Sequence, residues 1–313
     1  MAAMLEFRTQ GYNPYAVKYS PYYDSRIAVA TSANFGIVGN GRVFALALTA
    51  QGVQVEKTFD TNDALYDLAW SEINENQLIV ACGDGSLKLF DLGIDDFPWS
   101  PTRNHSIKTL PIGNCTYSTS FCPSNPALIS AVSSDSHLRI FDLRTPSSAK
   151  YHLTATIPVH ASGPQPSAGA SAPAEILTHD WNKYRDTVIA TGGVDRVLRT
   201  FDIRNPNGGP LSIMQGHEYA VRRLSWSPHS SDTLISASYD MTVRLWNDGS
   251  SQQQAPAMGP AIGSQMGIMN RHTEFVTGVD WCLFGMGGWV ASVGWDERVL
   301  LWDANMLMGQ RIP

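Results

Sequence analysis

The chain is poor in cysteine and has no long apolar run. Only four of its 313 residues are cysteine, Cys82, Cys115, Cys122 and Cys282, and no two of them form a CxxC pair. We therefore expect reduced, buried thiols rather than a disulfide framework. No stretch approaches the roughly 18 apolar residues of a membrane span, and residues 1–10 lack the apolar centre of a signal peptide. These features predict a cytosolic protein that does not cross a membrane.

Charge and catalytic motifs are sparse as well. The 22 Lys and Arg residues against 28 Asp and Glu residues give a net charge of −6. This balance argues against nonspecific binding to nucleic acid or an anionic membrane, and it permits a basic ligand. The chain contains no G-x-S-x-G, HExxH, Walker or G-x-G-x-x-G motif, and its histidines do not have metal-ligand spacing. We therefore expect a protein that is not an enzyme, without cofactor or metal.

What the chain does contain is a repeat. Its most complete copy, residues 216–248, reads GHEYAVRRLSWSPHSSDTLISASYDMTVRLWND. Apolar and polar residues alternate in runs that turns separate, which is typical of β-strands. Two copies carry the same four polar residues at matching offsets: His217, Ser236, Asp240 and Trp246, then His272, Ser292, Asp296 and Trp302. This spacing predicts hydrogen bonds between a loop His, a strand Ser, a turn Asp and a strand Trp within one four-stranded blade.

Reduced copies of the pattern follow elsewhere. Thr191, Asp195 and Phe201 form one, while Asp135 with Phe141 and Asp84 with Phe90 keep only the turn residue and the aromatic. A Ser-His-Asp set also resembles a hydrolase triad, but a nucleophile is used once and these sets recur. The repetition therefore indicates a scaffold.

The period of the repeat predicts an all-β fold, a WD-repeat β-propeller. We expect a single domain over residues 1–313 with six repeats. The last repeat leaves little chain for an outer strand, so we expect an N-terminal strand near Leu5–Phe7 to complete it and close the ring. Two inserts rich in small or polar residues, about 161–173 and 250–269, are expected to be flexible loops.

The face of a propeller that most often binds partners is formed by the loops that lead into each blade's first strand. Aligning the repeats on the aromatic residue that ends this strand gives a group that we call the rim residues: Asn62, Asp63, Tyr66, Asp67, Glu175, Leu177, Glu218, Tyr219, Arg222, Glu274 and Phe275. Acids with aromatic neighbours suit a cationic, amphipathic peptide. The alternative is that each acid only keeps its own loop soluble.

Several segments resemble one known family, the WD-repeat receptors for the type 2 peroxisomal targeting signal (peroxin 7). They are YAVKYSPYYDSRIAVATSANFGIVGNG, FDTNDALYDLAWSEINENQLIVACGDGSLKLFD, AEILTHDWNKY with ATGGVDRVLR, the copy at 216–247, and HTEFVTGVDW with GWDERVLLWD. The similarity covers most of the chain, including Ala174–Leu177, Tyr219–Arg223 and His272–Phe275 in the rim loops.

The resemblance implies a cytosolic receptor that cycles to the peroxisome. Its cargo would be thiolase-like proteins with an N-terminal R/K-[LVI]-x5-[HQ]-[LA] signal, bound as a helix, and an import co-receptor and the peroxisomal docking complex would be further partners. The family has seven blades, whereas this chain shows six repeats, with most of the third absent and a break at Pro98–Trp99. The alternative function is a general WD-repeat scaffold subunit of a ubiquitin-ligase or chromatin complex.

Overall fold

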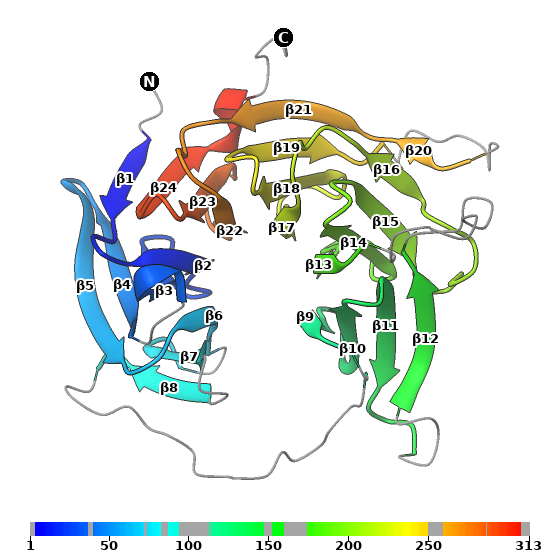
Figure 1. Cartoon of the computed structure of the whole chain (residues 1–313), viewed down its shortest axis with the longest axis horizontal. Coiled ribbons are helices and arrows are strands. Elements are labelled where there is room, and N and C mark those ends of the chain that lie inside the picture. Colours follow the sequence, from blue (N-terminus) through cyan, green and yellow to red (C-terminus); the bar gives the residue numbers. More distant parts are fainter. Residues whose placement is uncertain are drawn as a thin grey trace. The chain divides into compact units, whose positions relative to one another are not determined.

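The computed structural model of the protein describes residues 4–36, 40–71, 74–82, 87–93, 112, 114–146, 152–159, 174–249, 259–285 and 287–307. These residues form β-strands and two short 3-10 turns, η1 (Ala33–Gly36) and η4 (Ala304–Leu307). The strands make six sheets in which almost all neighbours pair antiparallel. The fold is therefore all-β, a six-bladed β-propeller, and the predicted class is confirmed (Figure 1).

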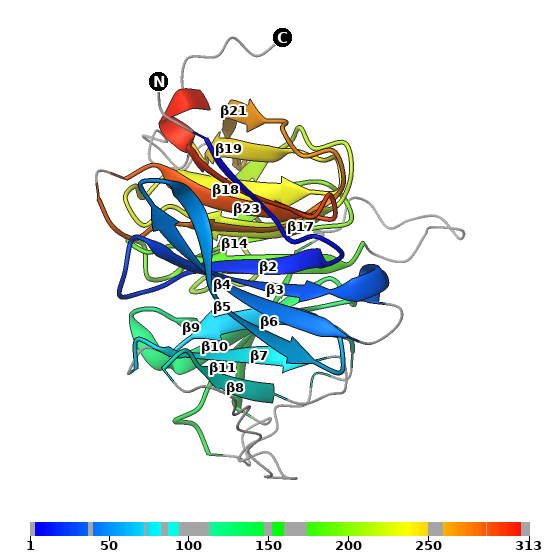
Figure 2. The same cartoon turned by 90° about the vertical axis from the view of Figure 1, so that its left-hand side faces the viewer.

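The blades fall into two compact units. The first unit comprises Met1–Ser106, Met241–Val243 and Gly267–Pro313. Its blade six consists of β22 (Val276–Trp281), β23 (Trp289–Gly294), β24 (Arg298–Asp303) and β1 (Leu5–Arg8). Blade one consists of β2 (Asn13–Tyr19), β3 (Arg26–Ser32), β4 (Gly41–Thr49) and β5 (Gly52–Thr61), and blade two of β6 (Leu65–Trp70), β7 (Gln77–Cys82) and β8 (Leu87–Asp91) (Figure 2).

The second unit comprises Ile107–Asp240 and Arg244–Met266. Its blade three consists of β9 (Thr116–Cys122), β10 (Asn125–Ser133), β11 (His137–Asp142) and β12 (Leu153–Pro158). Blade four consists of β13 (Ile176–Trp181), β14 (Val188–Gly193), β15 (Leu198–Asp202), β16 (Ser212–Met214) and the short parallel strand β20 (Ala261–Ile262). Blade five, most of which lies in this unit, consists of β17 (Val221–Trp226), β18 (Thr233–Ser238), β19 (Val243–Asn247) and β21 (Ser264–Met269).

The N-terminal strand is part of the last blade. Leu5, Glu6, Phe7 and Arg8 of β1 pair antiparallel with Leu301, Leu300, Val299 and Arg298 of β24. Glu6 also accepts hydrogen bonds at 2.9 and 2.7 Å from the Arg298 guanidinium. The expected outer strand is thus supplied by the N-terminus, and closure of a ring stays a prediction.

One sequence-based expectation about loops was wrong. Residues 250–269 were expected to form a flexible insert, but β20 and β21 lie within them. The composition, rich in Gln, Gly and Met, hid the strands, because neither strand alternates apolar and polar residues cleanly. Several other expectations fall outside the described residues: Asp84, the break at 98–99, and the insert at 161–173.

The core of each unit lies between neighbouring blades, because a middle strand buries both of its faces. In β3, Ile27 and Val29 pack in a cluster shared with blade six, while Ala28 and Ala30 pack in a cluster shared with blade two. The alternation follows from the two-residue period of a strand. Each buried Ile or Val contributes about 1.5–3 kcal/mol relative to exposure, so the side-to-side packing holds the blades of a unit together.

Aspartates in two first strands add hydrogen bonds between neighbouring blades. Asp280 accepts from the backbone N–H of Tyr19 at 3.1 Å and from the Lys18 ammonium at 2.9 Å. Asp180 likewise accepts from the backbone N–H of Trp226 at 2.9 Å and from Lys183 at 2.9 Å. Each aspartate directly precedes the tryptophan that ends its strand, so the dipeptide Asp-Trp marks this contact in both units.

Candidate functional site

The polar set of blade five forms one continuous chain of hydrogen bonds. The Trp246 indole N–H donates to Ser236 Oγ at 2.8 Å, and Ser236 Oγ lies 2.6 Å from His217 Nε2. His217 Nδ1 lies 2.7 Å from an oxygen of Asp240. Because Ser236 accepts from Trp246, its own proton is available to His217 Nε2, and the imidazole proton then sits on Nδ1 toward Asp240. Burial lowers the pKa of His217, so the ring stays neutral.

Blade six repeats this arrangement. His272 Nδ1 lies 3.0 Å from Asp296, His272 Nε2 lies 2.9 Å from Ser292 Oγ, and Trp302 donates to Ser292 at 3.2 Å. Both sets match the hydrogen bonds predicted from spacing. All their groups are engaged with one another inside a blade, which is what scaffolding requires. The carboxylates also fix the chain before the first strand, since Asp240 accepts from Glu218 N–H and Asp296 from Thr273 N–H, both at 3.0 Å.

In blades three and four, where the polar set is incomplete, ion pairs hold the turns. Asp135 pairs with Arg139, and this guanidinium, with Ser133, lowers the pKa of the Asp135 carboxyl. In blade four, Asp195 pairs with Arg199 at 2.5 Å. The residue after each turn aspartate has a left-handed backbone in four blades: Ser136, Arg196, Met241 and Glu297, with φ between 61 and 69°. The four turns therefore share one backbone conformation although their sequences differ.

A further buried set joins blades three and four and was missed from sequence. Ser130 Oγ lies 2.7 Å from His179 Nε2 and accepts from the Trp181 indole N–H at 2.8 Å. Blade three has Ala131 where blades five and six have the serine, and its neighbour Ser130 points to the opposite face of the strand. There it meets the next blade. The set uses the same residue types in a different spatial arrangement.

Every first strand carries a β-bulge near its start. The register skips one residue in each of the six strands, at Tyr15, Tyr66, Tyr117, Leu177, Arg222 and Thr277. Each of these bulge residues lies four positions before an aromatic residue, which ends the strand in five blades and is the last but one in β9: Tyr19, Trp70, Phe121, Trp181, Trp226 or Trp281. A bulge reorients a side chain and often lies beside a functional site. Thr277 is buried and bonds Pro14 O at 2.7 Å, whereas the other five are half-buried or exposed.

In the first unit, four aromatic rings link the rim loops of three blades. Tyr66 packs edge-on against Tyr15 at 5.3 Å between ring centroids, and Tyr15 lies 5.9 Å from Trp295. Trp295 in turn lies 5.4 Å from Phe275. Tyr66 and Phe275 were predicted rim residues, and Tyr15 and Trp295 were not. Tyr15 could have been found from its position four residues before Tyr19, the aromatic residue that ends β2.

Polar rim residues of the first unit neighbour this aromatic row in sequence, since Asp67 follows Tyr66 and Glu274 precedes Phe275. Asn62 and Glu274 are exposed. Asp63 caps its own loop by accepting from Ala64 N–H at 2.8 Å, and Asp67 accepts from Leu68 N–H at 2.9 Å. One carboxylate oxygen of Asp63 therefore holds its own loop, and one of Asp67 holds the next residue of β6.

In the second unit, the rim residues of blades four and five contact neighbouring blades. The Tyr117 hydroxyl donates to the Glu175 carboxylate at 2.9 Å, which raises the pKa of Tyr117 to about 12. The Arg196 guanidinium donates to the backbone oxygen of Glu218 at 3.1 Å and so joins blade four to the loop of blade five. Tyr219 is 61% exposed beside it. Leu177 and Arg222 are the half-buried bulge residues of these blades.

Glycine allows close backbone approach behind two of these loops. A Cβ atom on Gly193 would lie 2.2 Å from the Glu175 carbonyl oxygen, and one on Gly41 would lie 2.5 Å from that of Asp63. Only glycine fits at such distances. These two positions therefore fix where the acidic loops of blades four and two run.

The predicted rim residues thus form two groups. Asn62, Asp63, Tyr66, Asp67, Glu274 and Phe275 belong to the first unit, and Glu175, Leu177, Glu218, Tyr219 and Arg222 belong to the second. Each group combines carboxylates with exposed rings. Within the described part of the chain, no cluster of three or more His, Cys, Asp or Glu is suited to a metal ion. No helix among these residues is long and apolar enough to cross a membrane.

Comparison with known proteins gives the class and then the family. Residues 208–247 and 263–303 match the family described as "WD domain, G-beta repeat", which defines a WD-repeat protein. The peroxisomal targeting signal 2 receptor of Saccharomyces cerevisiae is 34% identical over 386 aligned positions, which cover 96% of this chain and 99% of the relative. That of Komagataella phaffii is 34% identical over 397 positions, covering 97% and 100%. The peroxisome biogenesis protein 7 of Arabidopsis thaliana is 35% identical over 322 positions, covering 94% and 96%.

With this identity over nearly the whole chain, the protein belongs to the family of peroxisomal targeting signal 2 receptors. All three alignments are longer than the 313 residues of the chain. The relatives therefore carry residues that have no counterpart here.

Proposed function

We propose that this protein is a receptor that binds the N-terminal type 2 targeting signal of peroxisomal matrix proteins. It acts by binding and performs no catalysis. The observation that carries the proposal is the set of bulge residues in each unit together with the acids that neighbour them in sequence. In five first strands the bulge residue is an accessible Tyr, Leu or Arg, and carboxylates stand beside it in both units.

The signal's chemistry matches these groups. Its spacing, R/K-[LVI]-x5-[HQ]-[LA], places a basic residue, apolar residues and His or Gln on one face of a helix. Tyr66, Tyr15 and Tyr219 offer apolar ring faces, and Asp63, Glu175 and Glu274 offer carboxylates for the basic residue. The Tyr117 hydroxyl holds the Glu175 carboxylate in place, so this acid is pre-oriented before the ligand arrives.

Fluorescence anisotropy with a labelled signal helix tests the proposal. We expect Asp63→Lys and Glu175→Lys to weaken binding tenfold or more, because a repelling charge replaces an attracting one. Asp24→Lys and Asp186→Lys are matched controls, since these exposed acids follow the ends of β2 and β13 rather than precede a first strand. Equal losses in controls and rim variants would refute the rim assignment.

The ligand supplies the second arm of the test. A helix whose Arg is replaced by Glu should lose binding to the wild-type chain and regain part of it with Glu175→Lys. Binding that ignores the helix's charge favours the alternative, a general scaffold subunit. In the cell we propose a cytosolic receptor that cycles to the peroxisome, with a co-receptor and the docking complex as its partners and thiolase-like proteins as its cargo.

A further inference from the structure

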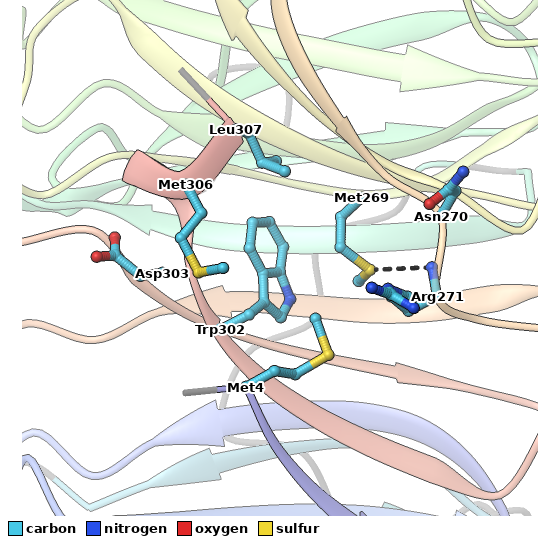
Figure 3. Close-up of a pocket in the computed structure, with 8 residues that line it drawn as sticks. All are labelled: Met4, Met269, Asn270, Arg271, Trp302, Asp303, Met306 and Leu307. Atoms are coloured by element: carbon cyan, nitrogen blue, oxygen red, sulfur yellow. Dashed lines mark hydrogen bonds between the residues drawn. The ribbon is translucent and has the colours of Figure 1, made fainter. Parts of the chain in front are cut away.

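A methionine-lined cavity lies in the first unit. It has a volume of about 270 Å³, and its apolar lining consists of Met4, Met269, Trp302, Met306 and Leu307 (Figure 3). Met4 directly precedes β1, Met269 ends β21, Trp302 belongs to β24, and Met306 and Leu307 belong to η4. None of these residues takes part in the proposed signal site, and the inference below does not depend on that site.

The cavity is built around one indole ring. Trp302 donates its N–H to Ser292, so only its apolar ring surface is left to face the cavity. The side chains of Met4, Met269 and Met306 surround that ring (Figure 3). Methionine is flexible and polarisable, and its sulfur interacts favourably with aromatic rings. Such a lining adapts to an aromatic guest.

Size and exposure indicate a guest of one side chain. Pockets for drug-sized ligands measure roughly 300–1,000 Å³, and this cavity is smaller. Met4 and Met306 remain 36% and 45% exposed although both border a buried tryptophan. Exposed apolar groups gathered beside a cavity are typical of an interaction site.

An uncompensated positive charge stands beside the cavity. The backbone of Arg271 is fixed, since its N–H donates to Met269 Sδ at 3.3 Å and its carbonyl accepts from Arg298 at 2.5 Å. Its exposed guanidinium makes no hydrogen bond or ion pair with any residue that the structure describes. Asp303 also lines the cavity, but it lies on the other side of Trp302 and accepts from Asn305 N–H at 2.9 Å (Figure 3). A carboxylate next to the guest would complement Arg271.

The geometry points to a second peptide-binding site on this protein, at which the cavity takes one aromatic side chain of a partner protein and Arg271 pairs with an acidic residue beside it. None of the lining residues is a rim residue, although Arg271 lies in the same loop as Glu274 and Phe275. The recognised element is a short acidic segment with one exposed aromatic residue.

Methionine-methyl NMR on the full chain tests this site. The probe is N-acetyl-Glu-Trp-amide, compared with N-acetyl-Lys-Trp-amide, and single Met→Leu variants assign the methyl signals. We expect the signals of Met4, Met269 and Met306 to shift, while Met214 and Met241 do not. An exposed ion pair contributes up to about 1 kcal/mol, which corresponds to about fivefold tighter binding of the Glu probe.

Two variants make the test decisive. Arg271→Glu should reverse the preference between the probes, while Arg204→Glu, an exposed arginine of the second unit, should not. Met306→Trp should fill the cavity and abolish the shifts, with an unchanged melting temperature showing that the chain is folded.

Three outcomes overturn the proposal. The first is equal affinity for the two probes. The second is binding of octanoate but of neither dipeptide, which would identify a lipid chain as the guest. The third is a methyl shift that depends on protein concentration without a probe, which would identify a second copy of the chain.

Discussion

A serine, a histidine and an aspartate in hydrogen-bond contact are usually associated with catalysis, yet here they hold sheets in place. In blade five the hydrogen-bonding groups of Ser236 and His217 engage other members of the set. The serine cannot act as a nucleophile toward solvent because it is fully buried. The value of the network is that no buried polar group is left unpaired, which matters more than the strength of any one bond.

Replacing Ser236 with Ala should therefore be costly. The change leaves the Trp246 N–H and His217 Nε2 buried without a partner, so we expect a loss of about 2–4 kcal/mol in the free energy of unfolding. Urea denaturation measures it, and Ser264→Ala, an exposed serine of the same unit, is the control. A loss below that of the control would show that the network does not stabilise the blade.

The buried His179 makes the free energy of unfolding depend on pH, in a direction that follows from its pKa. Burial lowers its pKa to about 4, below the value of about 6.5 in an unfolded chain. The unfolded state therefore binds the proton more readily, and stability present above pH 6.5 is lost as the pH falls toward 4. The shift corresponds to about 3 kcal/mol.

Urea unfolding between pH 7 and pH 4.5 measures this dependence. In His179→Gln the dependence should be smaller by most of that amount, and in His229→Gln it should match the wild type. If the free energy of unfolding changed with pH equally in the wild type and in His179→Gln, His179 would not be the cause of the decrease.

At the scale of elements, β1 links the N-terminus to the last blade. Phe7 of this strand packs edge-on against Phe44 of blade one at 5.8 Å. We expect Phe7→Ala to destabilise the first unit by about 2–4 kcal/mol, less than a fully buried Phe, because this side chain is only half-buried. Glu6→Gln should cost below 1 kcal/mol, since its ion pair with Arg298 is partly exposed. Thermal unfolding of both variants shows which of them is less stable. A greater loss of stability in Glu6→Gln than in Phe7→Ala would mean that charge rather than packing holds β1 in the blade.

The elements also show where sequence reasoning worked. Strands that end in Trp, such as Val221–Trp226 and Val276–Trp281, could be placed because this buried aromatic residue recurs at the same position in the repeat. β21 could not, because an outer strand with Gly267 and polar neighbours has no such pattern. Tyr15 and Tyr117 were missed because blades one and three lack a full polar set. Trp295 was missed because it follows β23, whereas only the loops before the first strands were searched. The bulges need coordinates, since an extra residue in a strand leaves no trace in one sequence.

At the scale of the whole molecule, the single-domain prediction has a direct test. Ser236→Ala acts in the second unit and Phe7→Ala in the first. If the chain is one cooperative domain, both variants should lower the midpoint of one common thermal transition. Calorimetry distinguishes this from two transitions, each moved by only one variant, which would show that the units unfold independently.

Net charge makes a second prediction at this scale. The chain carries −6 and the proposed signal is cationic, so raising salt from about 50 to 300 mM should weaken signal binding severalfold through screening. Anisotropy titrations at both salt concentrations measure it. Affinity that does not change with salt would assign recognition to apolar contacts alone.

The bulges have a consequence for how such a surface can change. An ordinary strand residue has a paired residue on the neighbouring strand, which limits the side chains that fit beside it. A bulge residue has no such paired residue, so this limit does not apply to it. Tyr15, Tyr66, Tyr117, Leu177 and Arg222 can each be exchanged while the pairing of every other residue is kept. Ligand specificity can then change through substitutions in one blade at a time, while the strand pairing of the fold is kept.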